Sequence, residues 1–195
     1  MTEREILMTG IGGQGIQLAA QVLCRAALAE GRDVQLFGSY GGMMRGGNTE
    51  ATIIVADGPV EAPPTVSRAW SALAVHHEHF APVARLLGPG AVVLVNKTVF
   101  EAAVDSDRFS VVEVPATELA GNAGNVMAAS MVMLGAFSAA TGIVSLSSLQ
   151  DAVGEALPPY RSQHVALNVT ALGLGHGAVS GQVTEAWPSV EAACK

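Results

Sequence analysis

The first segment that could do chemistry is rich in glycine and follows a short apolar run at residues 6–9. It has the spacing G-x-G-x-x-G, and the residues that carry it are Gly10, Gly12, Gly13, Gln14 and Gly15. Glycines at these places let the chain turn tightly, and the free N–H groups of a following helix can bind a phosphate. The pattern predicts a phosphate or nucleotide site. The alternative is that the glycines only allow a strand and a helix to pack closely.

A second glycine-rich segment carries a cation. It contains Tyr40, Gly41, Arg45, Gly46 and Gly47. A guanidinium held among glycines can bind a phosphate or a carboxylate with two parallel hydrogen bonds. We expect this loop to emerge beside Gly12, at the sheet edge where open α/β proteins bind ligands. The alternative is that Arg45 pairs with an acid at an interface.

The usual dinucleotide site lacks one of its parts. It needs an acidic residue at the end of the second strand to hold the ribose hydroxyls, and residues 36–39 read Leu-Phe-Gly-Ser. Asp33 lies at the start of that strand, which is the wrong edge of the sheet. The chain also has no G-x-x-x-x-G-K-[ST] segment. A free-standing dinucleotide oxidoreductase is therefore the weaker interpretation.

The remaining polar residues do not form a recognisable catalytic or metal site. His76, His77, Glu78 and His79 are consecutive, and neighbouring side chains point in different directions, whereas metal ligands usually share a face. They are better explained as the end of a strand and the start of a helix. No Ser–His–Asp arrangement or acid pair is evident. We predict no catalytic residue and no metal ligand in this chain.

The patterning along the chain predicts an α/β fold with a mostly parallel sheet and a helical C-terminal part. Strands are expected at residues 6–9, 34–37, 49–56, 70–75, 91–95 and 111–114. Helices are expected from residue 16 to about 30, and over 79–87, 125–140, 147–156 and 164–174, with Gly88-Pro89-Gly90 ending the second. The first forty residues read as one right-handed βαβ unit. We expect a single domain over residues 1–175 and a loosely ordered tail over 176–195.

Composition narrows the function. Of 195 residues, 50% are apolar and 14% are charged, and the net charge is −7. A chain this apolar folds, and without a basic stripe it is not expected to bind nucleic acid. With so few charged side chains, much of the surface must be uncharged. We therefore expect a partner to cover part of that surface, and we expect the isolated chain to self-associate.

Cysteine usage and hydropathy point to a cytoplasmic protein. The two cysteines, Cys24 and Cys194, are too few for an iron–sulfur cluster and do not form a disulfide framework. The uncharged stretch Val126–Val144 is about long enough to span a bilayer. It is rich in small and polar residues and has no flanking positive charge, so we predict a buried core helix and no membrane span.

Three motifs in this order resemble a known family. They are the glycine segment with Gln14, the Tyr-Gly…Arg-Gly-Gly loop, and Asn125-Val126-Met127 leading into Met133-Leu134-Gly135-Ala136. Together they resemble the gamma subunit of 2-oxoacid:ferredoxin (acceptor) oxidoreductases over about residues 5 to 175.

The resemblance implies a Rossmann-like three-layer domain that carries no cofactor of its own. Enzymes of this family oxidatively decarboxylate a 2-oxoacid, pass the acyl group to coenzyme A and send two electrons to ferredoxin or another acceptor. Thiamine diphosphate lies in alpha and beta subunits, and iron–sulfur clusters lie in beta and delta subunits or fused domains. The gamma subunit helps to place coenzyme A, which assigns ligand-binding roles here to the glycine segment, Tyr40, Arg45, Gly46, Gly47 and Asn125. The isolated chain is expected to be inactive. A purely structural subunit that binds no ligand is the alternative.

Two departures from the family pattern stand out. Residues 42–44 read Gly-Met-Met where the family often has Pro-Glu-x, so a carboxylate is missing beside Arg45. Trp70 stands where the family tends to have Asp at the start of a strand. Both departures indicate a divergent branch, with a different 2-oxoacid or acceptor.

Overall fold

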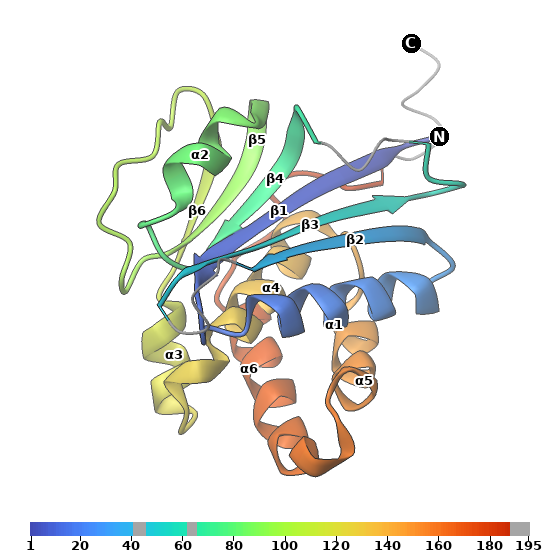
Figure 1. The fold of residues 1–195 in the computed structure, drawn as a ribbon, viewed down its shortest axis with the longest axis vertical. Coiled ribbons are helices and arrows are strands. Elements are labelled where there is room, and N and C mark those ends of the chain that lie inside the picture. Colours follow the sequence, from blue (N-terminus) through green and yellow to red (C-terminus); the bar gives the residue numbers. More distant parts are fainter. Residues whose placement is uncertain (41–45, 62–65, 188–195) are drawn as a thin grey trace.

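A computed structural model describes residues 1–40, 46–61 and 66–187. Its centre is a six-stranded sheet in the order β2-β3-β1-β4-β5-β6 (Figure 1). The strands are β1 (Glu3–Ile11), β2 (Asp33–Tyr40), β3 (Asn48–Ala56), β4 (Ala69–Ala74), β5 (Leu87–Asn96) and β6 (Ser110–Val114).

Five of these strands point the same way. β1, β4, β5 and β6 pair in parallel, while β3 runs antiparallel to both β1 and β2. The predicted α/β class with a mostly parallel sheet is therefore confirmed. One detail was wrong: the two strands of the first βαβ unit are not neighbours. β3 folds back against β2 and fills the place between β2 and β1, so it pairs along both of its edges.

Helices cover the two faces of the sheet unequally. They are α1 (Ile16–Ala29), α2 (Phe80–Arg85), α3 (Ala116–Asn122), α4 (Ala129–Thr141), α5 (Leu146–Ala156) and α6 (Val165–Gly177), with short 3-10 helices η1 (Val126–Ala128) and η2 (Pro159–His164). α1, α4, α5 and α6 lie on one face and α2 on the other, so the sheet is the middle of three layers (Figure 1). The predicted helical C-terminal part is the thick layer below the sheet.

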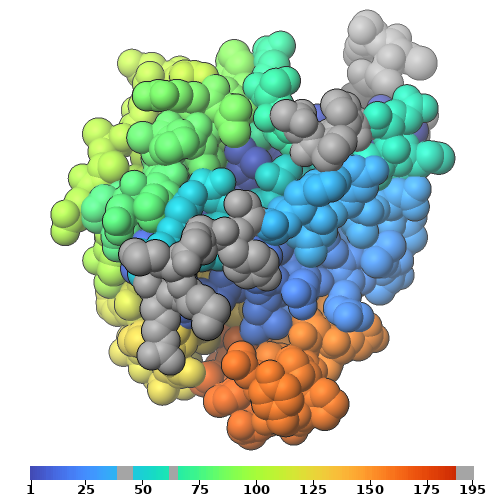
Figure 2. Space-filling model, in the orientation of Figure 1, coloured from blue at the N-terminus to red at the C-terminus, as the bar shows by residue number. Residues whose placement is uncertain are grey.

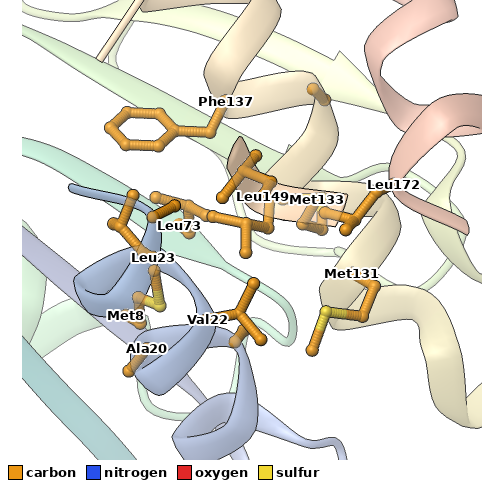
Figure 3. Close-up of a cluster of buried hydrophobic side chains, with 14 of the residues drawn as sticks. Met8, Ala20, Val22, Leu23, Leu73, Met131, Met133, Phe137, Leu149 and Leu172 are labelled. Carbon is orange, nitrogen blue, oxygen red and sulfur yellow. The ribbon is translucent and has the colours of Figure 1, made fainter. Parts of the chain in front are cut away.

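The main core lies between the sheet and α1 and α4. Figure 3 shows Met8 of β1, Leu23 of α1 and Phe137 of α4 in one cluster, and each of these side chains is fully buried. α4 is buried on nearly all sides because the sheet packs on one side and α6 on the other. This explains the apolar stretch 126–144. In the part of the chain that is described, we find no helix with the length and apolar character needed to cross a membrane.

α4 and α6 cross with their backbones in contact. A Cβ added to Gly135 would overlap the carbonyl group of Leu172, and one added to Gly175 would overlap the carbonyl of Val132. Only glycine fits at a crossing this close. The Leu-Gly-Ala segment that contributed to the family resemblance is therefore a helix-packing motif.

The chain remains packed beyond the predicted domain end at residue 175. α6 continues to Gly177, and the N–H groups of Val183 and Ala186 donate to the carbonyls of Ala140 and Thr141. The Trp187 indole N–H donates to the Ile143 carbonyl at 2.9 Å. Residues 183–187 thus make hydrogen bonds to distant parts of the chain, which the local glycines and polar residues do not reveal, and the loosely ordered tail over 176–195 stays a prediction. Residues 188–195 lie outside the described part.

One predicted helix end was also wrong. α2 ends at Arg85, and the segment Gly88-Pro89-Gly90, which we expected to end it, belongs to β5. Leu87 pairs with Ala69 of β4, and the register then shifts before Val92 pairs with Ser71. The two glycines and the proline lie where the register shifts, and from the local sequence alone they predict a turn.

Candidate functional site

The glycine segment forms the turn between β1 and α1. Gly13 and Gly15 adopt left-handed backbone conformations, with φ of 104° and 79°. A Cβ on Gly15 would lie 2.8 Å from the Ser130 hydroxyl oxygen, so this position needs glycine for conformation and for space. The turn therefore brings the start of α1 against the start of α4.

Gln14 serves the turn itself. Its side-chain oxygen accepts a hydrogen bond from the Ile11 backbone N–H at 2.9 Å, and the backbone N–H of Gln14 donates to the Ile11 carbonyl at 3.1 Å. A Cβ on Gly10 would lie 2.6 Å from that side-chain oxygen, so Gly10 leaves the space that Gln14 fills. We predicted Gly10 and Gln14 as ligand-binding residues, and the structure places both in an internal brace.

The described end of the second glycine-rich segment, Gly46-Gly47, lies beside this turn, as the sequence indicated. The Gly12 N–H donates to the Gly47 carbonyl at 2.8 Å, and the Gly46 N–H donates to the Gly12 carbonyl at 3.5 Å. The Gly12 amide is therefore engaged and is not a free donor for an anion. Tyr40 pairs with Thr49 at the end of β2. Arg45 lies outside the described residues.

Asn125 lies at the start of η1, close to the same turn. Its side chain caps η1 by accepting the Met127 N–H at 3.0 Å. The Met127 side chain reaches to 3.9 Å from the position of a Cβ on Gly13. Asn125 and the turn thus share one side of a pocket with a volume of about 210 Å³.

We call this cavity the η2 pocket. Its lining residues are Gly13, Gly15, Leu18, Asn125, Met127, Ala128, Leu157, Arg161, His164, Leu167 and Asn168. The wall opposite the turn is η2 and the start of α6. Among the residues that the structure describes, no carboxylate lines it, whereas the whole chain carries a net charge of −7.

The sequence analysis did not identify the polar residues on that wall. Arg161 and His164 lie about 150 residues from the glycine turn and belong to no motif, so local spacing held no signal for them. A basic pair at i and i+3 in the run Pro-Tyr-Arg-Ser-Gln-His was the only hint. Asn168 is 8% exposed, and its side-chain N–H donates to the His164 carbonyl at 2.8 Å.

The histidine run lies at the end of β4. His76 and His77 stack with ring centroids 4.5 Å apart. Burial lowers the pKa of His76, and the neighbouring His77 lowers it further. Within residues 1–40, 46–61 and 66–187, no group of three or more His, Cys, Asp or Glu side chains is placed to hold a metal ion.

Trp70 lies at the opposite end of the sheet from the glycine turn. It is the second residue of β4, packs edge-on against Phe137 with centroids 6.0 Å apart, and has the Arg4 guanidinium 4.8 Å from its ring centroid. The departure at this position therefore changes the core and not the ligand edge. The other departure, at residues 42–44, falls outside the described part.

The sheet order also bears on dinucleotide binding. A nicotinamide dinucleotide fold places the second strand next to the first, and here β3 lies between them, with Asn48 opposite Ile11. β2 also starts at Asp33, which confirms that this carboxylate is at the wrong edge. The geometry favours an anion at the start of α1 over a dinucleotide across the sheet edge.

Known proteins share this architecture. Residues 5–178 match the family described as pyruvate ferredoxin/flavodoxin oxidoreductase. The chain is 32% identical over 162 residues to the 2-oxoglutarate synthase subunit KorC of Methanothermobacter thermautotrophicus, covering 80% of this chain and 86% of that protein. It superposes on the gamma subunit of a keto/oxoacid ferredoxin oxidoreductase from Geobacter sulfurreducens with a TM-score of 0.78 and 28% identity, over 91% of this chain and 97% of the other.

A larger enzyme contains the same fold. The 2-oxoglutarate:ferredoxin oxidoreductase of Magnetococcus marinus, whose structure holds 2-oxoglutarate, coenzyme A and succinyl-CoA, matches with a TM-score of 0.80 at 17% identity. The match covers 93% of this chain and 32% of that one, and it shows the fold alone. The family match, which extends along most of the chain, confirms the resemblance inferred from the motifs: the protein belongs to the pyruvate ferredoxin/flavodoxin oxidoreductase family.

Proposed function

We propose that this chain is the gamma-type subunit of a multisubunit 2-oxoacid:ferredoxin (acceptor) oxidoreductase. The observation that carries the proposal is the length of the match, because the chain covers 97% of a gamma subunit and 86% of a KorC subunit. The complex would oxidise a 2-oxoacid and coenzyme A to an acyl-CoA and CO₂, and pass the two released electrons to ferredoxin or another acceptor.

Partner subunits would supply the redox groups. An iron–sulfur cluster is usually held by about four thiolates, and the whole chain has two cysteines. Cys24 is buried, and burial raises its pKa to about 12, so at neutral pH it is a protonated core thiol. Alpha and beta subunits with thiamine diphosphate, and a cluster-bearing beta or delta subunit, complete this proposal, together with a cytoplasmic location.

The contribution of this chain would be to position coenzyme A. The N–H groups in the first turn of α1 have no hydrogen-bond partner within the helix. Neither an acidic side chain nor a capping side chain occupies that end. With the Gly12 and Gln14 amides engaged, the free donors would be those of Gly13 and of the first turn of α1, and Arg45 would add its charge. Holding the thiol near an acyl intermediate on a partner lowers the entropic part of the barrier.

Reconstitution tests this function. The chain is produced alone and together with thiamine-bearing and cluster-bearing subunits, and 2-oxoacid-dependent reduction of a viologen dye is measured with and without coenzyme A. We expect activity only in the assembled complex, and its loss when this chain is omitted. Activity of the isolated chain, or a fully active complex without it, would refute the proposal.

A purely structural role is favoured by one observation. Gly12 forms backbone hydrogen bonds with both Gly46 and Gly47, which leaves fewer free amides for a ligand. Calorimetric titration of the assembled complex with coenzyme A, using wild type and Arg45→Ala, separates the two roles. A lower affinity in the variant supports ligand positioning. Unchanged affinity with weaker subunit association supports a docking role for the loop.

A further inference from the structure

The two edge strands of the sheet differ in how they are protected. Within the part of the chain that the structure describes, β2 pairs only with β3 and β6 only with β5, so each has one unpaired edge. β6 has five residues, carries the Glu113 carboxylate in an ion pair with Lys97, and is followed by Pro115. Short length, charge and proline are features that keep an edge strand from pairing with another chain. β6 is therefore a protected edge.

β2 lacks these features over most of its length. It has eight residues, and its pairing with β3 runs from Asp33 to Tyr40 without a shift of register. Residues 34–40 contain no charged residue and no proline. In Figure 2 the light-blue segment that includes β2 lies at the surface. β2 is thus a regular, uncharged edge, which can form main-chain hydrogen bonds with an added strand.

The middle of β2 adds apolar surface to this edge. Leu36 is 36% exposed and Phe37 is 40% exposed. Val34 packs against the main core, and side chains alternate between the faces of a strand, so Leu36 lies on the α1 face and Phe37 on the opposite face. A strand added at this edge would therefore cover apolar side chains on both faces.

The distribution of charge favours a second copy of this chain as the added strand. The chain carries a net charge of −7, so two copies repel over most of their surfaces. Two copies of residues 34–40 avoid this repulsion, because no like charges face each other across the pair. Each joined sheet then ends at the protected strand β6, so the assembly closes as a two-fold dimer and does not grow into a fibre.

Symmetry limits the register of such a pair. A two-fold axis perpendicular to the sheet makes the two β2 strands antiparallel and places residues of the same face opposite each other. With the axis at Phe37, residues 34–40 pair, Asp33 lies outside the paired stretch, and each Phe37 faces Phe37 of the other copy. An axis at Leu36 would bring Asp33 into the pair and place Phe37 opposite Gln35. Facing aromatic side chains and the absence of charge favour the axis at Phe37.

We propose that two copies of this chain pair antiparallel through β2, with the two-fold axis at Phe37, and form one continuous sheet. This gives the self-association expected from the composition a specific surface. The inference does not depend on the proposed function. β1 and β2 run in the same direction, since both are antiparallel to β3, so the two glycine turns lie at opposite ends of the joined sheet.

Charge swaps at the axis test the inference in the full chain by analytical ultracentrifugation. Phe37→Lys and Phe37→Glu each place two like charges opposite each other, and we expect either one to raise the dimer dissociation constant about tenfold or more. An equal mixture of the two variants places Lys opposite Glu and should restore most of the dimer. Recovery on mixing also shows that both variants fold.

Leu86→Lys is the matched control for these variants. Leu86 is 39% exposed, and its carbonyl accepts the N–H of Ala69 in β4, which lies three strands away from β2. The substitution adds the same charge at a side chain of the same exposure. We expect it to leave the dimer dissociation constant at the wild-type value.

A disulfide locates the axis independently. With the axis at Phe37, Phe37→Cys places two cysteines opposite each other with Cα atoms about 4.5–5.5 Å apart, within the range of about 4.4–6.8 Å that a disulfide allows. Cys194 is replaced by serine in these variants, and Cys24 is buried. We expect mild oxidation to link Phe37→Cys into a covalent dimer and to leave Gln35→Cys unlinked. The reverse result would overturn the register.

Several other results overturn the inference. They are a wild-type chain that stays monomeric at about 100 µM, a dimer that Phe37→Lys does not weaken, and charge-swapped variants that stay monomeric when mixed. If the wild-type chain is monomeric and Phe37→Lys reduces its incorporation into a complex with thiamine-bearing subunits, the edge belongs to a partner subunit and the inference fails. These measurements do not involve 2-oxoacid-dependent activity, so the proposed function is tested separately.

Discussion

The α4–α6 crossing and the η2 pocket are neighbouring parts of the same helical layer with opposite character. At the crossing, backbone meets backbone through Gly135 and Gly175, with no space left. The C-terminal segment up to Trp187 then bonds to the end of α4. In the pocket, Arg161 and His164 are exposed, and the start of α1 has no capping side chain.

This difference separates what holds the domain together from what it can bind. Substitutions at the crossing should reduce stability and leave ligand affinity intact in the molecules that remain folded. Substitutions in the pocket should do the reverse. Each prediction below either sharpens that separation or contradicts it.

The largest effect is expected from Gly135→Ala. The new methyl group would overlap the backbone of Leu172, so α4 and α6 must move apart, at a cost of about 3 kcal/mol in unfolding free energy. Urea denaturation followed by circular dichroism measures it. Gly154→Ala on α5 is the control: the position is exposed with nothing within 4 Å, so alanine should stabilise the helix by about 0.5–1 kcal/mol. Equal effects of the two substitutions would contradict the close crossing.

Trp187→Ala should come next. It removes the indole hydrogen bond to Ile143 and the ring under the Arg32 guanidinium, which lies 4.0 Å from the ring centroid. We expect a loss of about 2 kcal/mol in unfolding free energy, with about half of it recovered by Trp187→Phe, which keeps a ring. Thermal denaturation of both variants tests this. Wild-type stability of Trp187→Ala would mean that the C-terminal segment does not support the domain.

Two capping residues allow a direct comparison of the regions. Ser145 caps the 11-residue helix α5 by accepting the Ser148 N–H at 3.1 Å, so Ser145→Ala should cost about 1 kcal/mol. Asn125 caps only the three-residue η1 at the pocket, and Asn125→Ala should cost less stability. In the assembled complex we expect Asn125→Ala, and not Ser145→Ala, to change the KM for coenzyme A. The opposite assignment of the two effects would break the proposed separation.

The smallest effect concerns pH. Burial lowers the pKa of His76 below 6.5, so the folded state holds fewer protons than the unfolded state as the pH falls through the unfolded value. Stability should therefore decline below about pH 6.5. Melting temperatures between pH 8 and 5.5 for wild type and His76→Asn measure it. The variant should lose less stability on acidification, and an equal loss would show that His76 does not contribute.

Apolar patterning predicted most of the fold. Short runs rich in apolar or β-branched residues marked the six strands, and the glycine spacing correctly placed a turn between β1 and α1. Such signals are local, because a buried strand must be apolar and a tight turn needs glycine at positive φ. The stretch 126–144 was correctly read as a core helix because it lacks the flanking charge of a membrane span.

Pairing between distant segments was not predictable in the same way. Nothing in residues 48–56 says that β3 lies between β1 and β2. Nothing near Gly175 shows that Val183, Thr184 and Ala186 donate hydrogen bonds to the end of α4. The candidate site divides similarly. The sequence identified the glycine turn and Asn125, while folding engaged the Gly12 amide and Gln14 internally and brought Arg161 across from η2.

The sequence by itself determined the layers, the turn and the family, because burial and backbone conformation limit residue types one position at a time. Only the tertiary structure decided which polar groups remain free. A donor is available to a ligand only if no other part of the folded chain has taken it, and that depends on contacts between segments far apart in the sequence.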